Sequence, residues 1–573
     1  MLHNLEFHIS YVSDGEVRKK TFLESFENKD LKIIVEKKRE DNLTSLKMDI
    51  YPKKNIEFKK IYGDLIFDFQ DKDKIYANGY QSWTDSREFS IKEKMKGISK
   101  LALPVAKKFN LKSYGDYNFQ KYSRKKGDFH SYTYSYIRRE NTYHLFASLT
   151  EESGFTVIET SSSNKRVRIS KDSSGLNIKD QYTPFQLIYT AGSEEKVFNK
   201  YFQTAGIEKP QGEKITGWTS WYNYYENITE EKILKNLDNF GKENKKIDVF
   251  QIDDGYQENV GDWLNVDKKK FPNGMKYIAK KIHKKGFKAG IWLSPFVCEK
   301  NSNLYKNHKD WLVKNKDGNP LWAGSNWSNF YSLDIYNIEV QNYLKKVFKT
   351  ILEDWGYDMV KLDFLYAACI VPRKDKTRGE IMTYGVDMLR EMVKDKLILG
   401  CGVPLGPAFG KFDYCRIGCD AGLDWDDKFY MKLLHRERIS TFNSLRNTVS
   451  RRHLNGRAFI NDPDVFLLRE ENIQLSKIQK KTLAVVNSIL GGLLFTSDDI
   501  SKYNKNQKKI FDQVLNSKNI KIIKLEIPSD NTYKVNYLDN SKKKIAYINL
   551  NSKPYTIDSL YLKPYESKVL QEV

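Results

Sequence analysis

Residues 216–254, TGWTSWYNYYENITEEKILKNLDNFGKENKKIDVFQIDD, decide the fold of this chain. TGWTSWYNY at 216–224 and IDVFQIDD at 247–254 are short apolar runs of the kind that form buried strands. Between them, TEEKILKNLDNFGKE has apolar residues at helical spacing, and Thr229 at its start predicts a helix N-cap. A strand, a helix and a second strand in this order predict a βαβ unit with parallel strands.

The same alternation continues toward the C-terminus. Further helices are expected at 273–286, where Gly286 closes the helix, and at 339–356 and 380–396. Further strands are expected at 287–296, 359–364, 397–403, 413–420, 458–466 and 492–500. Eight such units over roughly 280 residues match the size of a (β/α)8 TIM barrel. A doubly wound open sheet is the alternative, but its usual glycine-rich first turn is missing.

Two β domains are predicted to flank the barrel. Residues 1–200 alternate apolar and polar positions in short runs such as FTVIET (155–160), which predicts an N-terminal antiparallel β-sandwich domain. Pro210 and its neighbouring glycines indicate a linker at 201–214, and the barrel is placed at 215–505. Short alternating strands near the end predict a small C-terminal antiparallel β domain at 506–573.

Composition limits where the protein acts. No apolar run reaches the ~18 residues needed to cross a bilayer, so no membrane span is expected. The N-terminus has no basic stretch followed by an apolar core, and five cysteines without a pairing pattern fit a reducing compartment. A cytoplasmic location is therefore expected.

The formal net charge of +22 raises the question of a nucleic-acid partner. The lysines are scattered, as at Lys280, Lys281, Lys284 and Lys285 of one predicted helix, so the charge is interpreted as solvated surface. We expect no nucleic-acid partner and no membrane partner, and the oligomeric state is not determined by the sequence.

Polar and aromatic side chains stand at nearly every predicted strand end, and in a barrel the C-terminal strand ends converge on one pocket. A single carboxylate there could instead cap a helix, but so many together are hard to explain by capping. The set comprises Trp218, Trp221, Asp253, Asp254, Trp292, Lys361, Asp363, Cys401, Arg416, Asp420, Asp462 and Asp464.

This set favours sugar hydrolysis. It lacks a Cys/His pair and a histidine cluster, and Cys415 and Cys419 lack further zinc ligands, so neither a metal nor a cofactor is expected. Aspartates supply the chemistry and the hydroxyl recognition, and tryptophan faces cover the apolar side of a pyranose. Metal-dependent carboxylate enzymes on the same barrel are the main rival.

Five segments resemble glycoside hydrolase family 36, and more specifically its shorter bacterial and archaeal members. They are GWTSW (217–221), IDDGYQ (252–257), FPNGMKYIAKKIHKKGFKAGIWLSPF (271–296), MVKLDF (359–364) and GCGVPLGPAFGKFDYCRIGCDAG (400–422). NGYQSWTDSREF (78–89) extends the resemblance into the N-terminal domain. The resemblance implies a retaining exo-α-galactosidase that removes terminal α-galactosyl residues from oligosaccharides or glycoconjugates by double displacement.

The resemblance also implies residue roles. Asp363 matches the nucleophile and Asp420 the acid/base, although Asp413, Asp424, Asp426 and Asp427 crowd Asp420 and are alternatives for the acid. Lys361, two residues from Asp363 on the same strand face, is expected to lower the pKa of the nucleophile. The residues matched to substrate binding are Trp221, Asp253, Asp254, Trp292, Lys361, Cys401, Gly402, Arg416 and Trp83.

Some of these matches carry finer expectations. Asp253 and Asp254 are matched to the sugar O4 and O6, and Arg416 to the neighbourhood of O2. Trp83 is expected in a loop over the barrel mouth, with a buried sandwich tryptophan as the alternative. Gly402 would leave room for an acetamido group at C2, whereas Leu405 would crowd it, which favours the galactoside.

Several alternatives stay open. An α-N-acetylgalactosaminidase, a galactosaminidase or an α-galactosyl transferase would use the same machinery. A catalytically silent carbohydrate-binding protein would lack one catalytic aspartate, and both candidates are present.

Overall fold

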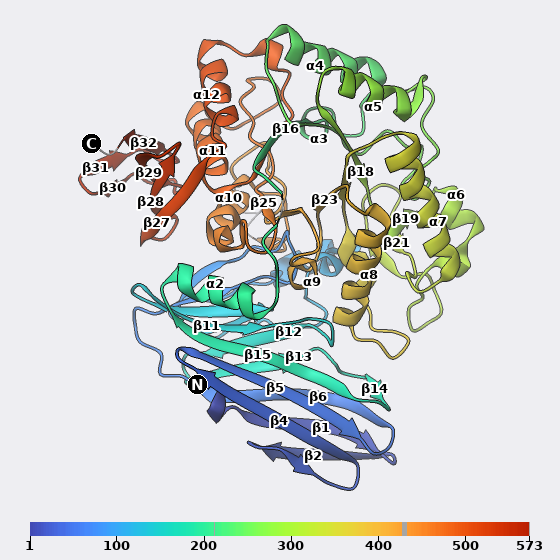
Figure 1. Cartoon of the computed structure of the whole chain (residues 1–573), viewed down its shortest axis with the longest axis vertical. Helices are drawn as coiled ribbons and strands as arrows, with labels where there is room; N and C mark the ends of the chain where they lie inside the picture. Colours follow the sequence, from blue (N-terminus) through green and yellow to red (C-terminus); the bar gives the residue numbers. More distant parts are fainter. Residues whose placement is uncertain (211, 427–432, 572–573) are drawn as a thin grey trace.

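The computed structural model describes residues 1–210, 212–426 and 433–571. An N-terminal β structure, a barrel and a C-terminal β structure follow one another along the chain (Figure 1). The N-terminal strands lie at one end of the molecule, the parallel barrel at the other, and the C-terminal strands beside the barrel. This is the predicted fold class, a TIM barrel with flanking β structure.

Two antiparallel sheets form the N-terminal sandwich. One has the order β2-β1-β6-β13-β12-β9 with β14 on β6, and the other β3-β4-β5-β15-β11-β10-β7-β8. Phe7 of the first sheet stacks on Phe185 of the second with ring centroids 6.0 Å apart, so the apolar faces meet between the sheets. The strands are β1 (Glu6–Ser13), β2 (Glu16–Phe22), β3 (Phe26–Glu27), β4 (Leu31–Glu40), β5 (Leu43–Pro52), β6 (Ile56–Ile66), β7 (Lys74–Ala77), β8 (Arg87–Ser90), β9 (Asp128–Tyr132), β10 (Tyr134–Arg139), β11 (Thr142–Ser148), β12 (Thr156–Ser161), β13 (Arg166–Lys171), β14 (Asn177–Ile178) and β15 (Tyr182–Gly192).

Eight parallel strands form the barrel, one for each predicted strand. Their order is β25-β24-β23-β22-β18-β17-β16-β26, and the single bridge between Val465 and Phe495 joins the two ends of this series. The barrel is therefore closed by a seam with little pairing. The strands are β16 (Ile215–Thr219), β17 (Val249–Ile252), β18 (Lys288–Leu293), β22 (Met359–Leu362), β23 (Leu397–Gly400), β24 (Tyr414–Arg416), β25 (Ile460–Asp462) and β26 (Leu493–Thr496).

The four helices that the apolar spacing predicts are present, and the structure adds further helices around the barrel. The Thr229 hydroxyl accepts a hydrogen bond from the backbone N–H of Lys232, which confirms the N-cap, and Gly286 follows its helix with φ +82°. The helices are α4 (Glu230–Lys242), α5 (Gly274–Lys284), α6 (Asn303–Asn307), α7 (Ile338–Lys349), α8 (Arg378–Val393), α9 (Leu405–Ala408), α10 (Thr441–Ser450), α11 (Lys477–Leu490) and α12 (Lys505–Leu515).

The first predicted strand is too long. β16 ends at Thr219, and Trp221 begins the short helix α3 (Trp221–Tyr224). Aromatic content alone does not separate a strand from the helical turn that follows it. Trp221 therefore lies beyond the strand, at the same end of the barrel as the other strand ends.

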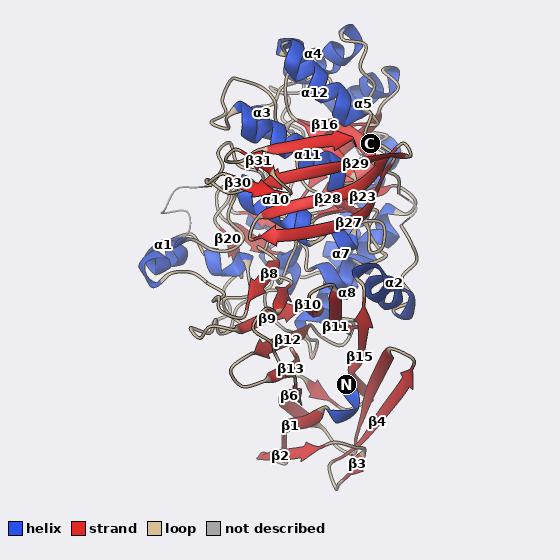
Figure 2. Ribbon diagram, turned by 90° about the vertical axis from the view of Figure 1, so that its left-hand side faces the viewer, coloured by secondary structure: helices blue, strands red, loops and turns tan. Residues whose placement is uncertain are grey.

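Two insertions add to this scaffold. After β18 the chain forms a small antiparallel sheet of β19 (Val297–Glu299), β20 (Trp322–Gly324) and β21 (Phe330–Ser332). Between β8 and β9 it forms a lobe around helix α1 (Leu103–Lys108), which projects at one edge of the molecule (Figure 2).

The C-terminal strands form a four-stranded sheet and a hairpin. The Thr482 hydroxyl of α11 donates to the carbonyl of Tyr565 and ties this sheet to the barrel. The strands are β27 (Ile520–Ser529), β28 (Thr532–Asp539), β29 (Lys542–Asn549), β30 (Tyr555–Ile557), β31 (Leu560–Leu562) and β32 (Ser567–Gln571).

The predicted domain boundaries meet helices at two places. Helix α2 (Glu194–Thr204) spans the predicted start of the linker, and α12 lies at the predicted start of the C-terminal domain. Phe511 of α12 packs on Phe240 and Phe466 of the barrel region. Within the described ranges, no helix is both long and apolar enough to cross a bilayer.

Candidate active site

Asp363 lies directly after β22 in the mouth of the barrel and is nearly fully buried. The Trp292 indole donates to its Oδ2 over 3.1 Å, and the backbone N–H of Phe364 donates to its Oδ1 over 2.8 Å. Two donors therefore fix both carboxylate oxygens. Phe364 has φ +53°, a left-handed conformation that turns the chain at this point.

The pKa of Asp363 is raised from its ordinary value, contrary to the expected lowering by Lys361. Burial is the largest cause, and the charge of Asp420 acts in the same direction. The Lys361 charge does lower the pKa of Asp363, but it does not outweigh these effects. The closeness of Lys361 to Asp363 along the strand correctly predicted that the lysine charge lowers the pKa of Asp363. It gave no information on burial, which has the larger effect and raises that pKa.

Lys361 forms its ion pair with Asp253 rather than with Asp363. Its Nζ lies 2.9 Å from Asp253 Oδ2, and both side chains are buried. Burial opposes the charge of Lys361, but Asp253 and Asp363 outweigh it and raise the pKa of the ammonium group. The Gln251 amide also donates to Asp253 Oδ2 over 2.7 Å, which holds this carboxylate from a second side.

Asp254 is held by two side-chain donors. Gln257 Nε2 donates to its Oδ1 over 2.6 Å, and Trp327 Nε1 donates to its Oδ2 over 2.8 Å. Burial raises the pKa of Asp254 to about 7. This carboxyl group therefore titrates near neutral pH in the ligand-free protein.

Sequence reasoning missed Trp327. It lies between β20 and β21, has φ +52°, and its ring lies 6.0 Å from that of Trp292 and 5.2 Å from that of Phe364. Residues 325–329 read as a polar loop far from any barrel strand end, so no local signal marks it. Only the position of the small insertion sheet brings the indole to Asp254.

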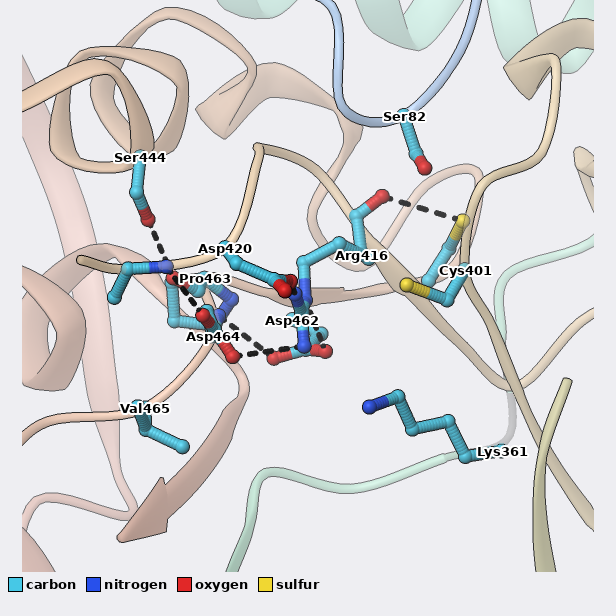
Figure 3. Close-up of polar contacts among 12 residues, drawn as sticks. Ser82, Lys361, Cys401, Arg416, Asp420, Ser444, Asp462, Pro463, Asp464 and Val465 are labelled. Atoms are coloured by element: carbon cyan, nitrogen blue, oxygen red, sulfur yellow. Dashed lines mark hydrogen bonds and ion pairs between the residues drawn. The ribbon is translucent and has the colours of Figure 1, made fainter. Parts of the chain in front are cut away.

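Arg416 is the centre of a four-membered charge cluster (Figure 3). Its Nη1 lies 2.7 Å from Asp420 Oδ1, its Nε 2.8 Å from Asp462 Oδ2, and its Nη2 2.8 Å from Asp464 Oδ1. The Asp420 side chain is 31% exposed, whereas those of Asp462 and Asp464 are almost fully buried. Asp420 is therefore the carboxylate of this cluster that a ligand can reach.

Asp464 is the second buried carboxylate of the cluster. The Tyr222 hydroxyl donates to its Oδ2 over 2.5 Å, and the backbone N–H of Ala421 donates to the same atom over 2.6 Å. Burial raises the pKa of Asp464. Tyr222 and Asp464 thus fix the turn in which Asp420 stands.

The alternatives for the acid lie in other surroundings. Asp413 precedes β24, at the opposite end of the barrel, and pairs with Arg390 at 2.5 Å. Asp426 is buried and pairs with Arg438 at 2.8 Å. Asp424 Oδ1 accepts the backbone N–H of Asp426. Asp427 lies outside the described residues.

Trp83 lies at the barrel mouth although it comes from the N-terminal part of the chain. Its indole donates to Cys401 Sγ over 3.2 Å, and its ring meets those of Phe364 at 5.1 Å and Tyr366 at 5.9 Å, both edge to face. The loop of residues 78–86 therefore packs directly beside the turn that follows Asp363.

Gly402 is closely packed on the side where a Cβ would stand. Gly402 has φ +56°, and a Cβ built on it would lie 2.9 Å from Trp83 Cζ2 and 3.0 Å from the backbone nitrogen of Phe364. The space is filled by a side chain that comes from more than 300 residues away in sequence. Glycine is required here because the chain passes close to Trp83 in a left-handed conformation.

Three further residues predicted to lie at the barrel mouth differ in burial and in their contacts. Trp221 is half-buried and packs edge to face on Tyr225 at 5.2 Å. Leu405 is buried at the start of α9. Trp218 is fully buried, and its indole donates to the carbonyl of Asp498, so it belongs to the core.

In the barrel mouth, Asp253 pairs with Lys361, and three aspartates surround Arg416. Among residues 1–210, 212–426 and 433–571, no group of three or more His, Cys, Asp or Glu side chains is arranged to hold a metal ion. Cys415 and Cys419 are buried free thiols.

Comparisons with known proteins show which chains this one is similar to. The melibiase family model matches residues 210–384. Alpha-galactosidase Mel36A of Lactobacillus acidophilus is 31% identical over 151 residues, 25% of this chain and 20% of that protein. Alpha-galactosidase AgaA of Geobacillus stearothermophilus is 29% identical over 151 residues, again 25% of this chain and 20% of that protein. These matches span about a fifth of the length of the curated relatives.

Solved structures resemble the chain over most of its length. TtGalA, an alpha-galactosidase from Thermus thermophilus in complex with p-nitrophenyl alpha-D-galactopyranoside, has a TM-score of 0.70 at 22% identity, covering 94% of this chain and 98% of that chain. The GH36 alpha-galactosidase AgaA from Geobacillus stearothermophilus has a TM-score of 0.65 at 13% identity, covering 94% and 80%. These likenesses show the fold. The match of residues 210–384 to the melibiase model shows that this part of the barrel is similar to that family, and most of the chain shares the fold of the GH36 alpha-galactosidase structures.

Proposed function

We propose that this protein is a retaining exo-α-galactosidase, with Asp363 as nucleophile and Asp420 as acid/base. The proposal rests on the presence of two carboxyl groups with different surroundings in the same barrel mouth. Asp363 is a buried carboxylate fixed by two donors, and Asp420 is a reachable carboxylate in the same mouth whose charge acts on it. Two carboxyl groups with different surroundings are what double displacement at a glycosidic bond requires.

The reaction follows from these positions. A carboxylate oxygen of Asp363 attacks the anomeric carbon while Asp420 gives its proton to the departing glycosidic oxygen, leaving a β-linked galactosyl ester. Asp420 then takes a proton from water, whose oxygen displaces Asp363 and yields α-galactose. A hydroxyl of another sugar in place of water would give the transferase reaction.

The other mouth residues support this chemistry. We propose that Asp253, Asp254 and Lys361 bind hydroxyl groups of the galactosyl ring, with Trp292 and Trp221 as walls. The three contacts of Arg416 support a positioning role for it toward Asp420, and we propose that Arg416 also lies near the sugar O2. Trp83, Cys401 and Gly402 would form the wall near C2.

An azide experiment tests the nucleophile. Asp363→Gly should abolish hydrolysis of 4-nitrophenyl α-galactoside, and added azide should restore part of it by forming β-galactosyl azide. Asp426→Gly serves as a control for a buried aspartate outside the proposed reaction. Formation of the α-azide would show that Asp363 is not the nucleophile, and turnover by unrescued Asp363→Gly would remove the proposal altogether.

The sugar substituent at C2 is the finer question. A type blood alpha-D-galactosamine galactosaminidase of Flavonifractor plautii is 27% identical over 208 residues, 33% of this chain and 19% of that protein. We favour the galactoside, because Trp83 fills the space beside Gly402. Measuring kcat/KM on the 4-nitrophenyl galactoside and N-acetylgalactosaminide, with and without Leu405→Ala, decides between them. Turnover of neither would favour a carbohydrate-binding protein.

Oligosaccharides are the proposed natural substrates, since TtGalA has been crystallised with stachyose. We place the protein in the cytoplasm because all five cysteines are free and buried. The proposed reaction needs neither a metal nor a cofactor.

A further inference from the structure

The lobe between β8 and β9 carries a large excess of positive charge. Residues 94–126, here called the basic lobe, contain ten Lys or Arg side chains and a single acidic one, Asp116. Asp116 is buried and bonded to His130 at 2.7 Å, so it does not neutralise the surface. The ten cations are Lys94, Lys96, Lys100, Lys107, Lys108, Lys112, Lys121, Arg124, Lys125 and Lys126.

None of these ten cations forms an ion pair within the part of the chain that the structure describes. Six of them line a cavity of about 920 Å³, together with Leu103 and Phe119 and with no carboxylate among the described lining residues. The six are Lys94, Lys96, Lys100, Lys112, Lys121 and Arg124. The charge is therefore concentrated on one concave surface.

Large apolar side chains stand exposed among these cations. Leu101 is 81% exposed, Leu103 40%, Val105 44% and Phe109 42%. They belong to α1 and the turns on either side of it, where Lys100, Lys107 and Lys108 alternate with them in sequence. Exposed leucine, valine and phenylalanine grouped together on a surface mark a contact with an apolar partner.

The basic lobe is fixed to the barrel mouth. The Tyr117 hydroxyl donates to Glu437 Oε2 over 2.8 Å, and Thr84 of the Trp83 loop donates to Glu437 Oε1 over 2.7 Å. Figure 2 shows α1 projecting on the side of the molecule where α3, which follows the first barrel strand, also lies. The exposed face thus lies beside the entrance of the barrel rather than behind it.

The combination of charges and apolar groups selects among partners. A nucleic acid or an acidic polysaccharide would pair with the lysines but leave Leu101 and Val105 in water. A second copy of the chain would bring its own net charge of +22 to the same surface. An anionic bilayer attracts the lysines to its headgroups and accepts the apolar side chains below them.

We propose that the basic lobe is a docking surface for an anionic lipid bilayer, on which the protein lies without spanning it. Binding to lipid does not depend on the proposed hydrolase activity and is measured separately from it.

Sedimentation with vesicles tests the electrostatic part. The full-length protein should bind vesicles of phosphatidylcholine mixed with phosphatidylglycerol, should not bind phosphatidylcholine alone, and should be released by salt. K100Q/K107Q/K108Q should weaken binding about a hundredfold, because each lysine near the surface contributes roughly fivefold. K276Q/K280Q/K284Q on α5, which removes the same charge elsewhere, should leave binding unchanged.

The apolar part has its own pair of variants. L101S/V105S should weaken binding about tenfold, since both side chains would lose their apolar surroundings. V17S/I66S changes two side chains of the sandwich that are 61% and 84% exposed, and it should leave vesicle binding unchanged. Thermal unfolding checks that each variant is folded.

Three results would overturn the proposal. If L101S/V105S bound vesicles as well as the unchanged protein does, while K100Q/K107Q/K108Q lost binding, the lobe would be a surface for a polyanion and not for a bilayer. A change in oligomeric state on Leu101→Ser without vesicle binding would indicate an interface between copies. Equal loss of vesicle binding in both lysine variants would indicate that net charge, and not the lobe, determines it.

Discussion

Asp254 illustrates how one buried carboxyl group depends on a residue that sequence reasoning overlooked. Its two oxygens accept from Gln257 and Trp327, and burial raises its pKa to about 7. Gln257 stands three residues away in the same turn, whereas Trp327 comes from another insertion. The indole therefore couples the small sheet to the proposed sugar site.

Trp327→Phe should weaken substrate binding more than it slows the chemical step. The change removes the donor to Asp254 Oδ2 and keeps the ring, so KM should rise and kcat/KM should fall about tenfold or more. Trp322→Phe is the matched control, because its indole donates to the backbone carbonyl of Gly324 and not to Asp254. A fall in kcat alone, or equal effects of both variants, would argue against a positioning role for Trp327.

Asp420→Ala should affect substrates according to their leaving groups. Hydrolysis of raffinose should fall by roughly a hundred- to ten-thousandfold, because its sugar leaving group needs a proton. Hydrolysis of 4-nitrophenyl α-galactoside should fall much less. Asp424→Ala is the comparison at a neighbouring carboxylate. If Asp420→Ala slowed both substrates equally, the proton would have to come from another residue.

At the scale of elements, the loop of residues 78–86 connects sandwich and barrel. Arg451, completely buried, donates to Asn78 Oδ1 over 3.1 Å and to the carbonyls of Ser82, at 2.6 Å, and Ile417, at 2.9 Å. One guanidinium thus joins the loop that carries Trp83 to the residue after β24. The wall at the proposed C2 position depends on this contact.

Arg451→Lys should loosen the loop although the charge is kept. A lysine cannot reproduce the planar set of donors, so buried carbonyls lose their partners and the free energy of unfolding should fall by about 3 kcal/mol. Activity should fall in parallel with that of Trp83→Ala, because both changes disturb the wall beside Gly402. Calorimetry and kcat/KM measure the two effects. Unchanged kinetics in both variants would confine the loop to a structural role.

At the scale of the whole molecule, burial of carboxyl groups makes stability depend on pH. The folded state raises the pKa of Asp254 from an ordinary value of 3.8 to about 7. The folded protein therefore holds a proton that the unfolded chain releases between these values. The stabilisation from this proton is complete below about pH 4 and is lost as the pH rises through 7.

Asp254→Asn should remove this pH dependence. Its stability relative to the unchanged protein should increase as the pH rises from 4 to 8, by on the order of 4 kcal/mol in total. The same substitution at exposed Asp317 provides the control, and unfolding is followed by calorimetry without sugar. If the free energies of unfolding of Asp254→Asn and the unchanged protein differed by the same amount at every pH, the raised pKa of Asp254 would be contradicted.

The order of elements was determined by the sequence. All eight barrel strands and four of the covering helices were predicted, because buried barrel strands are short apolar runs and these helices are amphipathic. Thr229 and Gly286 were predicted as helix ends, because a cap hydrogen bond and a positive φ angle depend only on residues nearby in the chain. Asp253, Asp254, Asp363, Arg416 and Asp420 were found because parallel strands deliver their C-terminal ends to one place.

What only the tertiary structure decided depends on contacts between distant segments. Trp327 reaches Asp254, Trp83 fills the space beside Gly402, and Lys361 pairs with Asp253 across neighbouring strands. Burial then reversed the expected direction of the pKa of Asp363. Local sequence reports spacing along the chain, whereas desolvation and long-range packing depend on everything that surrounds a side chain, and only the assembled fold determines that.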